Sequence, residues 1–346
     1  MKIVLGNTNS EVILLKYWYP QEIWYENEVE LHHLGREILN KMALLQIPLK
    51  PIAAHNKARL EINDPQKRFI ASKRVLILGT KKDLKLIPCL PSADYRIVIG
   101  TSCPAFCEYC YLSDSLGERV FPRVYVNLDE ILNPVLSLLK KERKKTVSFE
   151  LSSSGDPLAT EHLTGLLGKT IAILGQEPNT QLRVVTKYDH VEPLLLLAHN
   201  QKTFFRFSLN TEYVITNFEH GTSSLKERIS AAEKLAQSGY PLGVIIAPII
   251  LYKNWENDYF DLVKYLADKL PFLQELELIT FRFSKRSKSK ILTRFPNSKL
   301  PFPQSGIRHK AFGKYVYDED SMNRIQTFFS AIIAKYFPHS KIAYFI

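Results

Sequence analysis

The sequence has few cysteines and no long apolar runs. Four cysteines in 346 residues do not suggest a disulfide framework, which belongs to short secreted domains. The longest apolar stretches, such as residues 244–251, are far below the roughly 20 residues that a membrane-spanning helix needs. No apolar segment of the secretory type follows the lysine near the N-terminus. We therefore expect a cytoplasmic protein with no membrane partner.

The chain also has fewer acidic than basic residues. The chain has 35 Asp and Glu against 46 Lys and Arg, which gives a formal net charge of +11. The excess is concentrated in residues 282–299, a stretch with seven basic residues and no acidic one. Solubility alone explains a basic excess that is spread evenly, whereas a concentrated one favours a polyanionic partner such as nucleic acid. The 45% hydrophobic content excludes a disordered chain.

Short β-branched runs alternate with helical patterns from residue 95 onward. The expected strands are Arg96–Gly100, Val147–Leu151, Leu182–Thr186, Phe204–Leu209, Leu242–Ala247 and Leu276–Phe283. The expected helices between them are Leu128–Lys141, Glu161–Leu174, Val191–His199, Ser224–Ser238 and Tyr259–Leu270. This alternation predicts an α/β fold of successive βαβ units, which form a curved parallel sheet or a partial barrel. Chemistry in such folds lies at the carboxyl ends of the strands.

The two ends of the chain have different patterns. Residues 1–94 contain a helical segment near Val29–Leu45 and a basic stretch near Lys57–Arg74, and we interpret them as an N-terminal extension. Residues 284–346 begin in the basic stretch and end in an amphipathic helix near Ser321–Tyr336. We therefore predict three parts: the extension at 1–94, the partial barrel at 95–283, and a C-terminal basic segment at 284–346 that contacts DNA.

Three of the four cysteines lie in one loop, residues 101–111, directly after the first expected strand. Cys103, Cys107 and Cys110 have the spacing Cys-x3-Cys-x2-Cys. Thiolates are soft ligands that suit iron-sulfur clusters and zinc. Zinc would need a fourth ligand, and no Cys-x2-Cys or His pair elsewhere supplies an obvious one. Three thiolates fit a four-iron cluster that keeps one iron open, and zinc remains the alternative.

This spacing resembles the signature of the radical S-adenosylmethionine (SAM) superfamily. Further stretches, in unbroken order from about Cys89 to Tyr317, resemble the spore photoproduct lyase family. They are CLPSADY, TSCPAFCEYCYL, LGERVFPRVYVNLDEIL, VVTKYDHV, FRFSLN, FEHGTSS and GKYVY. The resemblance implies a partial parallel (β/α)6 barrel of radical SAM type with an N-terminal extension and a C-terminal basic segment.

The resemblance also implies a reaction. Members of this family repair spore photoproduct, a methylene-bridged thymine dimer in DNA, with a [4Fe-4S] cluster and SAM. The reduced cluster cleaves SAM to methionine and a 5'-deoxyadenosyl radical, which abstracts a hydrogen atom from the lesion. The cross-link then fragments, and the product radical must receive a hydrogen atom. The implied partners are damaged DNA and an electron donor such as flavodoxin or ferredoxin.

The resemblance assigns roles to residues that match the family's motifs. Cluster binding is implied for Cys103, Cys107 and Cys110, and a place in the SAM pocket for Lys187, Ser208 and Ala247. Tyr109 and Tyr111 match tyrosines of the radical relay. Each assignment has a structural alternative: a solvated lysine, a serine that ends a strand, or tyrosines that only pack the loop.

The segment Phe149–Leu158 departs from the family pattern. Ser153 occupies the position of the cysteine that donates the final hydrogen atom, and a serine O–H bond is too strong for this role. Gly155 replaces a family serine, and residues 154–157 approach the Gly-Gly-Glu-Pro element that binds the SAM amino group elsewhere in the superfamily. We expect Asp156 and the backbone near Gly155 to contact the methionine end of SAM, the alternative being a helix N-cap.

Cys89 is the one cysteine outside the loop, and it leaves three hypotheses open. It replaces the missing thiol, with Tyr109 or Tyr111 carrying the radical between, and the chain repairs spore photoproduct. Alternatively Cys89 is an inert buried thiol, and the chain is a diverged radical SAM enzyme with another substrate. The third hypothesis is a non-catalytic iron-sulfur or DNA-binding protein that retains the fold.

Overall fold

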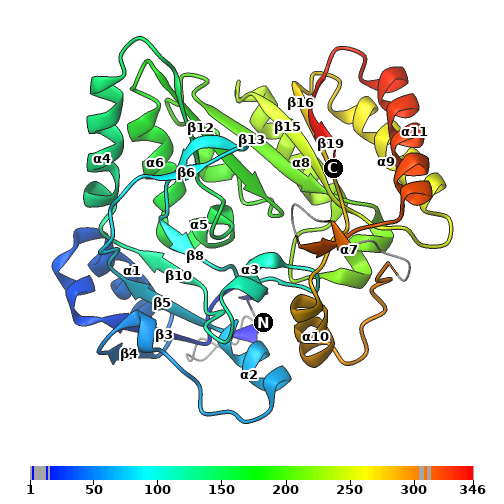
Figure 1. The fold of residues 1–346 in the computed structure, drawn as a ribbon. Helices are drawn as coiled ribbons and strands as arrows, with labels where there is room; N and C mark the ends of the chain where they lie inside the picture. The colour runs from blue at the N-terminus through cyan, green and yellow to red at the C-terminus, as the bar shows by residue number, and fades with distance from the viewer. Residues whose placement is uncertain (1, 4–12, 15, 304–307, 310–312, 346) are drawn as a thin grey trace.

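The structure, a computed structural model, describes residues 2–3, 13–14, 16–303, 308–309 and 313–345. Its centre is an eight-stranded sheet curled into an open half-barrel (Figure 1). The spatial order of its strands is β19-β16-β15-β13-β12-β11-β7-β6, and all neighbours run parallel except β6 and β7. The bounds are β6 Ile87–Cys89, β7 Ala93–Arg96, β11 Val147–Glu150, β12 Thr180–Thr186, β13 Thr203–Leu209, β15 Leu242–Ile249, β16 Glu275–Thr280 and β19 Lys341–Phe345.

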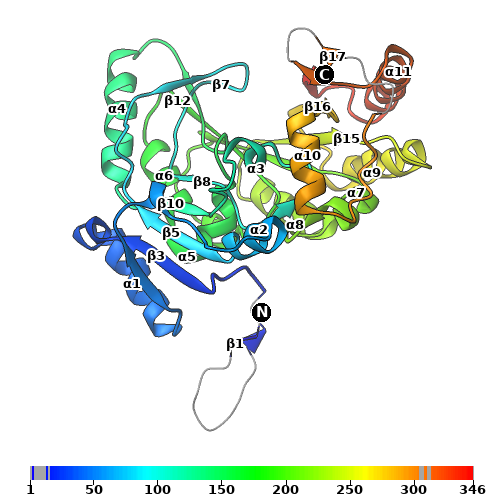
Figure 2. The same ribbon diagram turned by 60° about the horizontal axis from the view of Figure 1, so that its bottom comes forward.

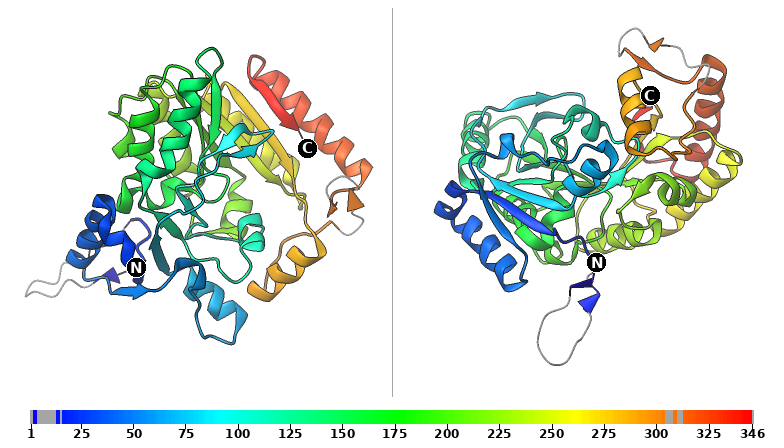
Figure 3. Two further views of the ribbon diagram at one scale, coloured as in Figure 1. Left: turned by 60° about the vertical axis from the view of Figure 1, so that its left-hand side comes forward. Right: turned by 90° about the horizontal axis from the view of Figure 1, so that it is seen from below.

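Helices cover the outer face of this sheet (Figure 3). They are α4 Leu128–Lys141, α5 Glu161–Thr164, α6 Leu166–Leu174, α7 Glu212–Phe218, α8 Leu225–Gln237, α9 Trp255–Lys269 and α11 Glu319–Tyr336. Each long helix has one apolar face, as in α4, where Ile131, Leu132, Val135 and Leu139 are buried. The strands between them are almost wholly buried, with all seven residues of β13 inside. A parallel sheet covered on its outer face explains the continuous apolar runs of the sequence.

A second sheet lies beside the half-barrel and is built largely from the N-terminal part of the chain. Its strand order is β4-β3-β5-β10-β8. The bounds are β3 Glu22–Glu26, β4 Leu49–Ile52, β5 Val75–Gly79, β8 Gly100–Thr101 and β10 Arg123–Tyr125. Helices α1 His33–Leu44 and α2 Pro65–Ser72 belong to the same region (Figure 2). Because β5 pairs with β10, residues before 94 and after 95 share one sheet.

Short elements complete the described chain. The paired strands are β1 Lys2–Ile3 with β2 Ile13–Leu14, β9 Phe106–Cys107 with β14 Glu219–His220, and β17 Arg308–His309 with β18 Lys314–Tyr315. The remaining helices are α3 Tyr111–Ser115 and α10 Lys285–Arg294, with 3-10 turns at Asn27–Leu31, His55–Lys57, Pro157–Thr160 and Glu192–Leu194. Within the described ranges, no helix combines the length and the apolar character needed to cross a membrane.

The predicted fold class is confirmed, and several element boundaries differ from the prediction. The expected helix Val191–His199 is wrong: only a single turn, Glu192–Leu194, forms there, and Leu196 in the same apolar run is 98% exposed. The expected helix Glu161–Leu174 is broken at Gly165, which has a left-handed φ of 61°.

The first expected strand, Arg96–Gly100, is divided between the two sheets, because β7 ends at Arg96 and β8 begins at Gly100. The three-part division at 94 and 283 stays a prediction. Parts of both end segments lie outside the described residues, namely 1, 4–12 and 15 in the extension and 304–307, 310–312 and 346 in the C-terminal segment.

Candidate active site

The cysteine loop crosses the carboxyl edge of the half-barrel and is held at three points. It leaves β8 of the small sheet, and Ser102 then forms a parallel bridge with Gly155, just beyond the end of β11. The amide of Ser102 donates to the carbonyl of Ser154 at 2.7 Å. Further on, β9 in the loop pairs with β14, so that Cys107 lies opposite Glu219. The loop is therefore fixed by segments distant in sequence, at the edge where a parallel sheet places its chemistry.

The three loop cysteines lie in a setting that suits a bound metal cluster. Cys107 is buried, and Cys103 and Cys110 are half-buried. Burial raises the pKa of the Cys103 thiol to about 11 and that of Cys107 well above its usual value, so metal binding is needed to hold them as thiolates. The ammonium groups of Lys73 and Lys187 act against these rises, on Cys103 and Cys107 respectively.

Within the described chain, no three His, Cys, Asp or Glu side chains are arranged to hold a single metal ion. A cluster makes a different demand, since each thiolate binds its own iron. Three thiols with two cations beside them form a donor set that fits an anionic iron-sulfur cluster rather than zinc.

Lys187 joins a buried polar network next to the loop. It follows β12 directly, and its Nζ donates to Glu219 Oε1 at 2.5 Å and to the Tyr109 hydroxyl at 3.3 Å. Tyr109 itself donates to the same carboxylate oxygen, while Arg228 pairs with Glu219 Oε2 at 2.6 Å. Burial opposes the charge of Glu219, but the cations of Arg228 and Lys187 hold its pKa down at about 2. Glu219 is therefore an anion that fixes both Tyr109 and Lys187.

Asp156 is buried and its carboxylate is occupied by protein donors. It accepts hydrogen bonds from the backbone amides of Leu158 and Lys187, at 3.1 and 2.8 Å, and from the Thr186 hydroxyl at 2.9 Å. Burial raises its pKa to about 6. Asp156 is thus the N-cap of the turn Pro157–Thr160, not of the helix that starts at Glu161, and it also orients the backbone of Lys187.

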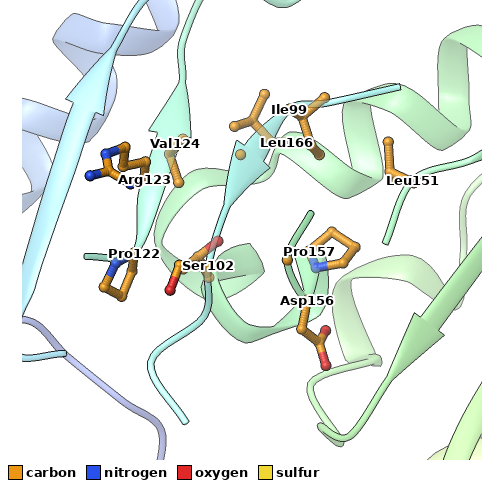
Figure 4. A pocket seen from close by; sticks show the side chains of 12 residues that line it. Ile99, Ser102, Pro122, Arg123, Val124, Leu151, Asp156, Pro157 and Leu166 are labelled. Atoms are coloured by element: carbon orange, nitrogen blue, oxygen red, sulfur yellow. The ribbon is translucent and has the colours of Figure 1, made fainter. Parts of the chain in front are cut away.

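Gly155 has a steric role in this arrangement. A Cβ atom at this position would lie 2.3 Å from the carbonyl oxygen of Ser102, far inside van der Waals contact. Figure 4 shows Ser102 and Asp156 on facing segments of a pocket of about 410 Å³ that lies between the loop, β10 and the end of β11. A side chain at this position would therefore require the cysteine loop or the strand end of this chain to move.

Tyr111, Ser153 and Cys89 meet on the other side of the loop. The hydroxyl of Tyr111 donates to the carbonyl of Ser153 at 3.0 Å. Ser153 and Cys89 are neighbours, and the serine hydroxyl lowers the thiol pKa slightly. Burial and the charge of Glu150 have the larger effect and raise the pKa of Cys89 overall. Tyr111 is 62% exposed, but partial loss of solvent around its hydroxyl group raises its pKa to about 12, and the nearby Cys110, Glu150 and Cys89 add to this rise. The structure therefore places Cys89 close to Ser153.

Ser208 and Ala247 lie on neighbouring strands further along the sheet. Ser208 is buried, and its carbonyl accepts from Arg228, the same side chain that pairs with Glu219. Ala247 lies in a register shift of β15 between Ile246 and Ile249, where it is half-buried although most of its strand is buried. Irregularities of this kind are frequent next to active sites. No direct contact joins either residue to the cysteine loop among the bonds described.

A pocket of about 570 Å³ lies between the cysteine loop and the basic helix α10. The loop contributes Cys107, Tyr109, Cys110 and Tyr111, and the facing wall includes Lys290. The helix lies beside α3, as Figure 2 shows, and is joined to it by hydrogen bonds.

Not every basic residue of α10 faces outward. Lys290 Nζ donates to the carbonyl of Asp114 at 2.7 Å, and Arg294 donates to the carbonyls of Ser113 and Gly117 at 2.8 and 2.6 Å. These two side chains satisfy the open carbonyl end of α3. Lys285 and Arg286 at the start of α10 are exposed.

Sequence reasoning missed three charged residues of this site: Lys73, Glu219 and Arg228. Glu219 lies in the stretch FEHGTSS, which carries the family resemblance, so its place in the sequence was a signal. Lys73 lies in the N-terminal region that we interpreted as an extension, and its Nζ donates to Ser102 Oγ and to the carbonyl of Cys103. Nothing in its surrounding sequence indicates this contact.

An open parallel half-barrel with a three-cysteine loop at its carboxyl edge defines a radical SAM fold. The family model "Spore photoproduct lyase" matches residues 18–346. Spore photoproduct lyase from Bacillus subtilis (strain 168) is 38% identical over 340 residues, covering 94% of this chain and 98% of the relative. Spore photoproduct lyase from Clostridium acetobutylicum is 36% identical over 331 residues, with coverage of 94% and 98%. The chain belongs to the spore photoproduct lyase family.

Solved structures agree with this assignment. A spore photoproduct lyase complexed with dinucleoside spore photoproduct superposes with a TM-score of 0.89 at 35% identity, covering 96% of this chain and 100% of the other. A mutant spore photoproduct lyase with bound AdoMet and dinucleoside spore photoproduct gives the same TM-score, identity and coverage.

Proposed function

We propose that this protein is a radical SAM lyase that repairs spore photoproduct in DNA, with Cys89 as the hydrogen-atom donor. The observation that carries the proposal is the position of Cys89 beside Ser153, within a family fold whose cysteine loop is complete. The substitution at Ser153 alone favoured a diverged enzyme with another substrate. A thiol close to Ser153 removes the main reason for that alternative.

The residues around the loop fit the two cofactors of the family. Cys103, Cys107 and Cys110 would hold a [4Fe-4S] cluster, and Lys187, Ser208 and Ala247 would line the SAM site. When bound, the two groups supply a carbon-centred radical that removes a hydrogen atom from the lesion. Asp156 positions the backbone of Lys187, and the backbone of Gly155 lets the cysteine loop close against the SAM site.

Cys89 has the properties that hydrogen-atom donation requires. The donor must keep its S–H bond, and burial together with the charge of Glu150 favours the neutral thiol by raising its pKa. Glu150 is held in place by the hydroxyl of Ser92, which donates to Glu150 Oε2 at 2.6 Å, and by Arg206. A thiol S–H bond is much weaker than a serine O–H bond, so Cys89 can donate to a carbon radical and Ser153 cannot.

Tyr111 and Tyr109 would return the radical from the donor to the cofactor side. After the thiol gives its hydrogen atom to the product radical, the sulfur takes a hydrogen atom from Tyr111, which contacts the Ser153 backbone next to Cys89. Tyr109, two residues earlier, lies beside Lys187 in the SAM region. The tyrosines would in turn regain a hydrogen atom from the group that first took one from the lesion, so that the cycle consumes no net oxidant or reductant.

DNA that carries the lesion is the proposed partner, bound along the basic segment that begins with α10. The exposed Lys285 and Arg286 would contact phosphates while the lesion reaches the pocket between α10 and the cysteine loop. We also propose an electron donor such as flavodoxin or ferredoxin, which would supply the electron that first reduces the cluster, and a cytoplasmic location.

The test is a repair assay under anaerobic conditions. Reconstituted protein is incubated with SAM, a reductant and a dinucleotide spore photoproduct, and we expect thymidylyl-thymidine as product. SAM cleavage without lesion, measured as 5'-deoxyadenosine, separates an enzyme from a non-catalytic relative. Cleavage of SAM with the lesion left intact would overturn the proposed substrate, and absence of both products would overturn the enzyme assignment.

A further inference from the structure

Lys73 is a lysine buried beneath the cysteine loop. It is the residue after α2, at the junction with β5 of the small sheet, and only 1% of its surface is exposed. Its Nζ donates to Ser102 Oγ at 2.9 Å and to the carbonyl of Cys103 at 2.7 Å. The Ser102 hydroxyl in turn donates to the carbonyl of Val120 at 2.7 Å, so its oxygen is free to accept from Lys73.

The two hydrogen-bond partners of this ammonium group are neutral acceptors. A buried charge is costly unless an opposite charge lies nearby. Burial lowers the pKa of Lys73, and the groups that act most strongly to keep its proton in place are Cys103, Cys110 and Cys107 as thiolates, in that order. Arg294 of α10 packs over the ring of Phe69, a residue of α2, and adds a second cation to this region. The site thus contains positive charge that the thiolates and a bound cluster can balance.

We propose that Lys73 is a positioning residue whose positive charge raises the reduction potential of the cluster held by Cys103, Cys107 and Cys110. This inference rests on the proposed function, since it assumes that the loop binds an iron-sulfur cluster. Adding an electron makes a cluster with its thiolates more negative, and a fixed cation in a region of low dielectric constant stabilises that reduced state. The ammonium group of Lys73 also donates a hydrogen bond to the backbone carbonyl of Cys103, the first cluster ligand. The fold therefore sets the distance between this ammonium group and the cluster.

This role gives the N-terminal sheet a function in the chemistry. The segment before residue 94 supplies, through the α2–β5 junction, a charge that the half-barrel itself does not place beneath Cys103. Tuning of this kind makes the cluster easier to reduce by a physiological donor.

The test compares neutral variants of Lys73 by potentiometric titration of the reconstituted cluster, followed by EPR without SAM or lesion. Lys73→Gln removes the charge but keeps two N–H donors, and Lys73→Met removes both. At the wild-type midpoint potential we expect the ratio of reduced to oxidised cluster to fall about tenfold in each, equal to a shift of about 59 mV for a one-electron couple. Lys67→Gln, an exposed lysine on the same helix, is the matched control and should leave the potential unchanged.

Iron content and melting temperature are measured for each variant. A wild-type potential in a folded, iron-loaded Lys73→Gln or Lys73→Met protein would overturn the proposal. A variant that melts like the wild type yet loses iron would also overturn it, because Lys73 would then build the site rather than tune it. Using two neutral variants guards against the failure of one to fold. The reduction potential is measured without catalytic turnover, so the test of Lys73 remains valid even if the protein shows no repair activity.

Discussion

The hydroxyl group of Tyr111 donates a hydrogen bond to the backbone carbonyl of Ser153, with 3.0 Å between the oxygen atoms. Tyr111 is the first residue of α3, directly after the last cysteine of the loop, and Ser153 lies just beyond β11. This bond joins the cysteine loop to the strand end beside which Cys89 lies. Tyr111 and Cys89, the residues proposed as radical relay and hydrogen donor, therefore lie near the same strand end.

Replacing Gly155 by alanine should damage the cysteine loop. The added Cβ would lie 2.3 Å from the Ser102 carbonyl oxygen, so one backbone segment must move. We expect a loss of about 1–3 kcal/mol in the free energy of unfolding, together with lower iron content after reconstitution. Gly165→Asn is the control, because Gly165 has a left-handed φ that asparagine tolerates and open space around it. Wild-type stability and iron content in Gly155→Ala would contradict this prediction.

Removing the ammonium group of Lys187 should weaken SAM binding without affecting iron content. We expect Lys187→Met to bind SAM about tenfold more weakly, a loss of about 1.4 kcal/mol, measured by calorimetry on the reconstituted protein. Ser208→Ala should have a smaller effect, since the structure shows its carbonyl engaged rather than its hydroxyl. Lys169→Met, an exposed lysine on α6, should bind SAM normally. Unaltered affinity in both Lys187→Met and Ser208→Ala would show that the SAM site lies elsewhere.

Basic residues of α10 should divide into two classes. Neutralising the exposed Lys285 and Arg286 should weaken DNA binding and flatten its salt dependence by up to about 0.9 log units for each phosphate that is no longer bound. Lys290→Gln should instead lower the melting temperature, because Lys290 donates a hydrogen bond to the carbonyl of Asp114 at the C-terminal end of α3. Lys335→Gln on α11 is the control for Lys290→Gln, because it also removes one positive charge. An unchanged salt slope after neutralisation of Lys285 and Arg286 would place the DNA on another face.

The stability of the fold should fall as the pH rises towards 7 because of Glu161. Burial raises the pKa of this carboxyl group to about 7 from 4.5, so the folded state binds its proton more tightly than the unfolded state does. The stabilisation is complete below pH 4.5 and is lost as the pH rises through 7, with a slope of at most about 1.4 kcal/mol per pH unit. Melting temperatures between pH 5 and pH 8 should fall less in Glu161→Gln than in the wild type and the exposed control Glu61→Gln. If the melting temperature of Glu161→Gln fell with pH as steeply as that of the wild type, the raised pKa of Glu161 would be contradicted.

The sequence predicted the half-barrel because its strands and helices follow local rules. Uninterrupted apolar runs such as Phe204–Leu209 and a clean 3.6-residue pattern such as Leu128–Lys141 became β13 and α4. The helix expected at Val191–His199 failed because an apolar run there is not all turned to the core, with Leu196 exposed. The small sheet was not predicted, since strands of two to five residues such as β8 depend on partners far along the chain.

The candidate site shows the same division between local and distant information. The motif spacing placed Cys103, Cys107 and Cys110 on one loop. The sequence also showed that Ser153 stands where the family has its hydrogen-donor cysteine, and so left open which thiol takes that role. Cys89 lies 64 positions before Ser153, and it comes close to that residue through the hairpin of β6 and β7, which pairs with β11. Lys73 and Glu219 reach the loop only through tertiary pairing, so no local pattern identifies them.

The central claim is that Cys89 donates the hydrogen atom that Ser153 cannot. The most direct measurement is the yield of thymidylyl-thymidine per 5'-deoxyadenosine formed, determined with dinucleotide spore photoproduct for the wild type, Cys89→Ala, and the double variant Cys89→Ala/Ser153→Cys. We expect clean repair by the wild type, and SAM cleavage with by-products and few turnovers in Cys89→Ala, since the product radical is left without a thiol. The double variant should recover clean repair, because a thiol returns to the same place. Repair by Cys89→Ala as clean as that of the wild type would contradict the account.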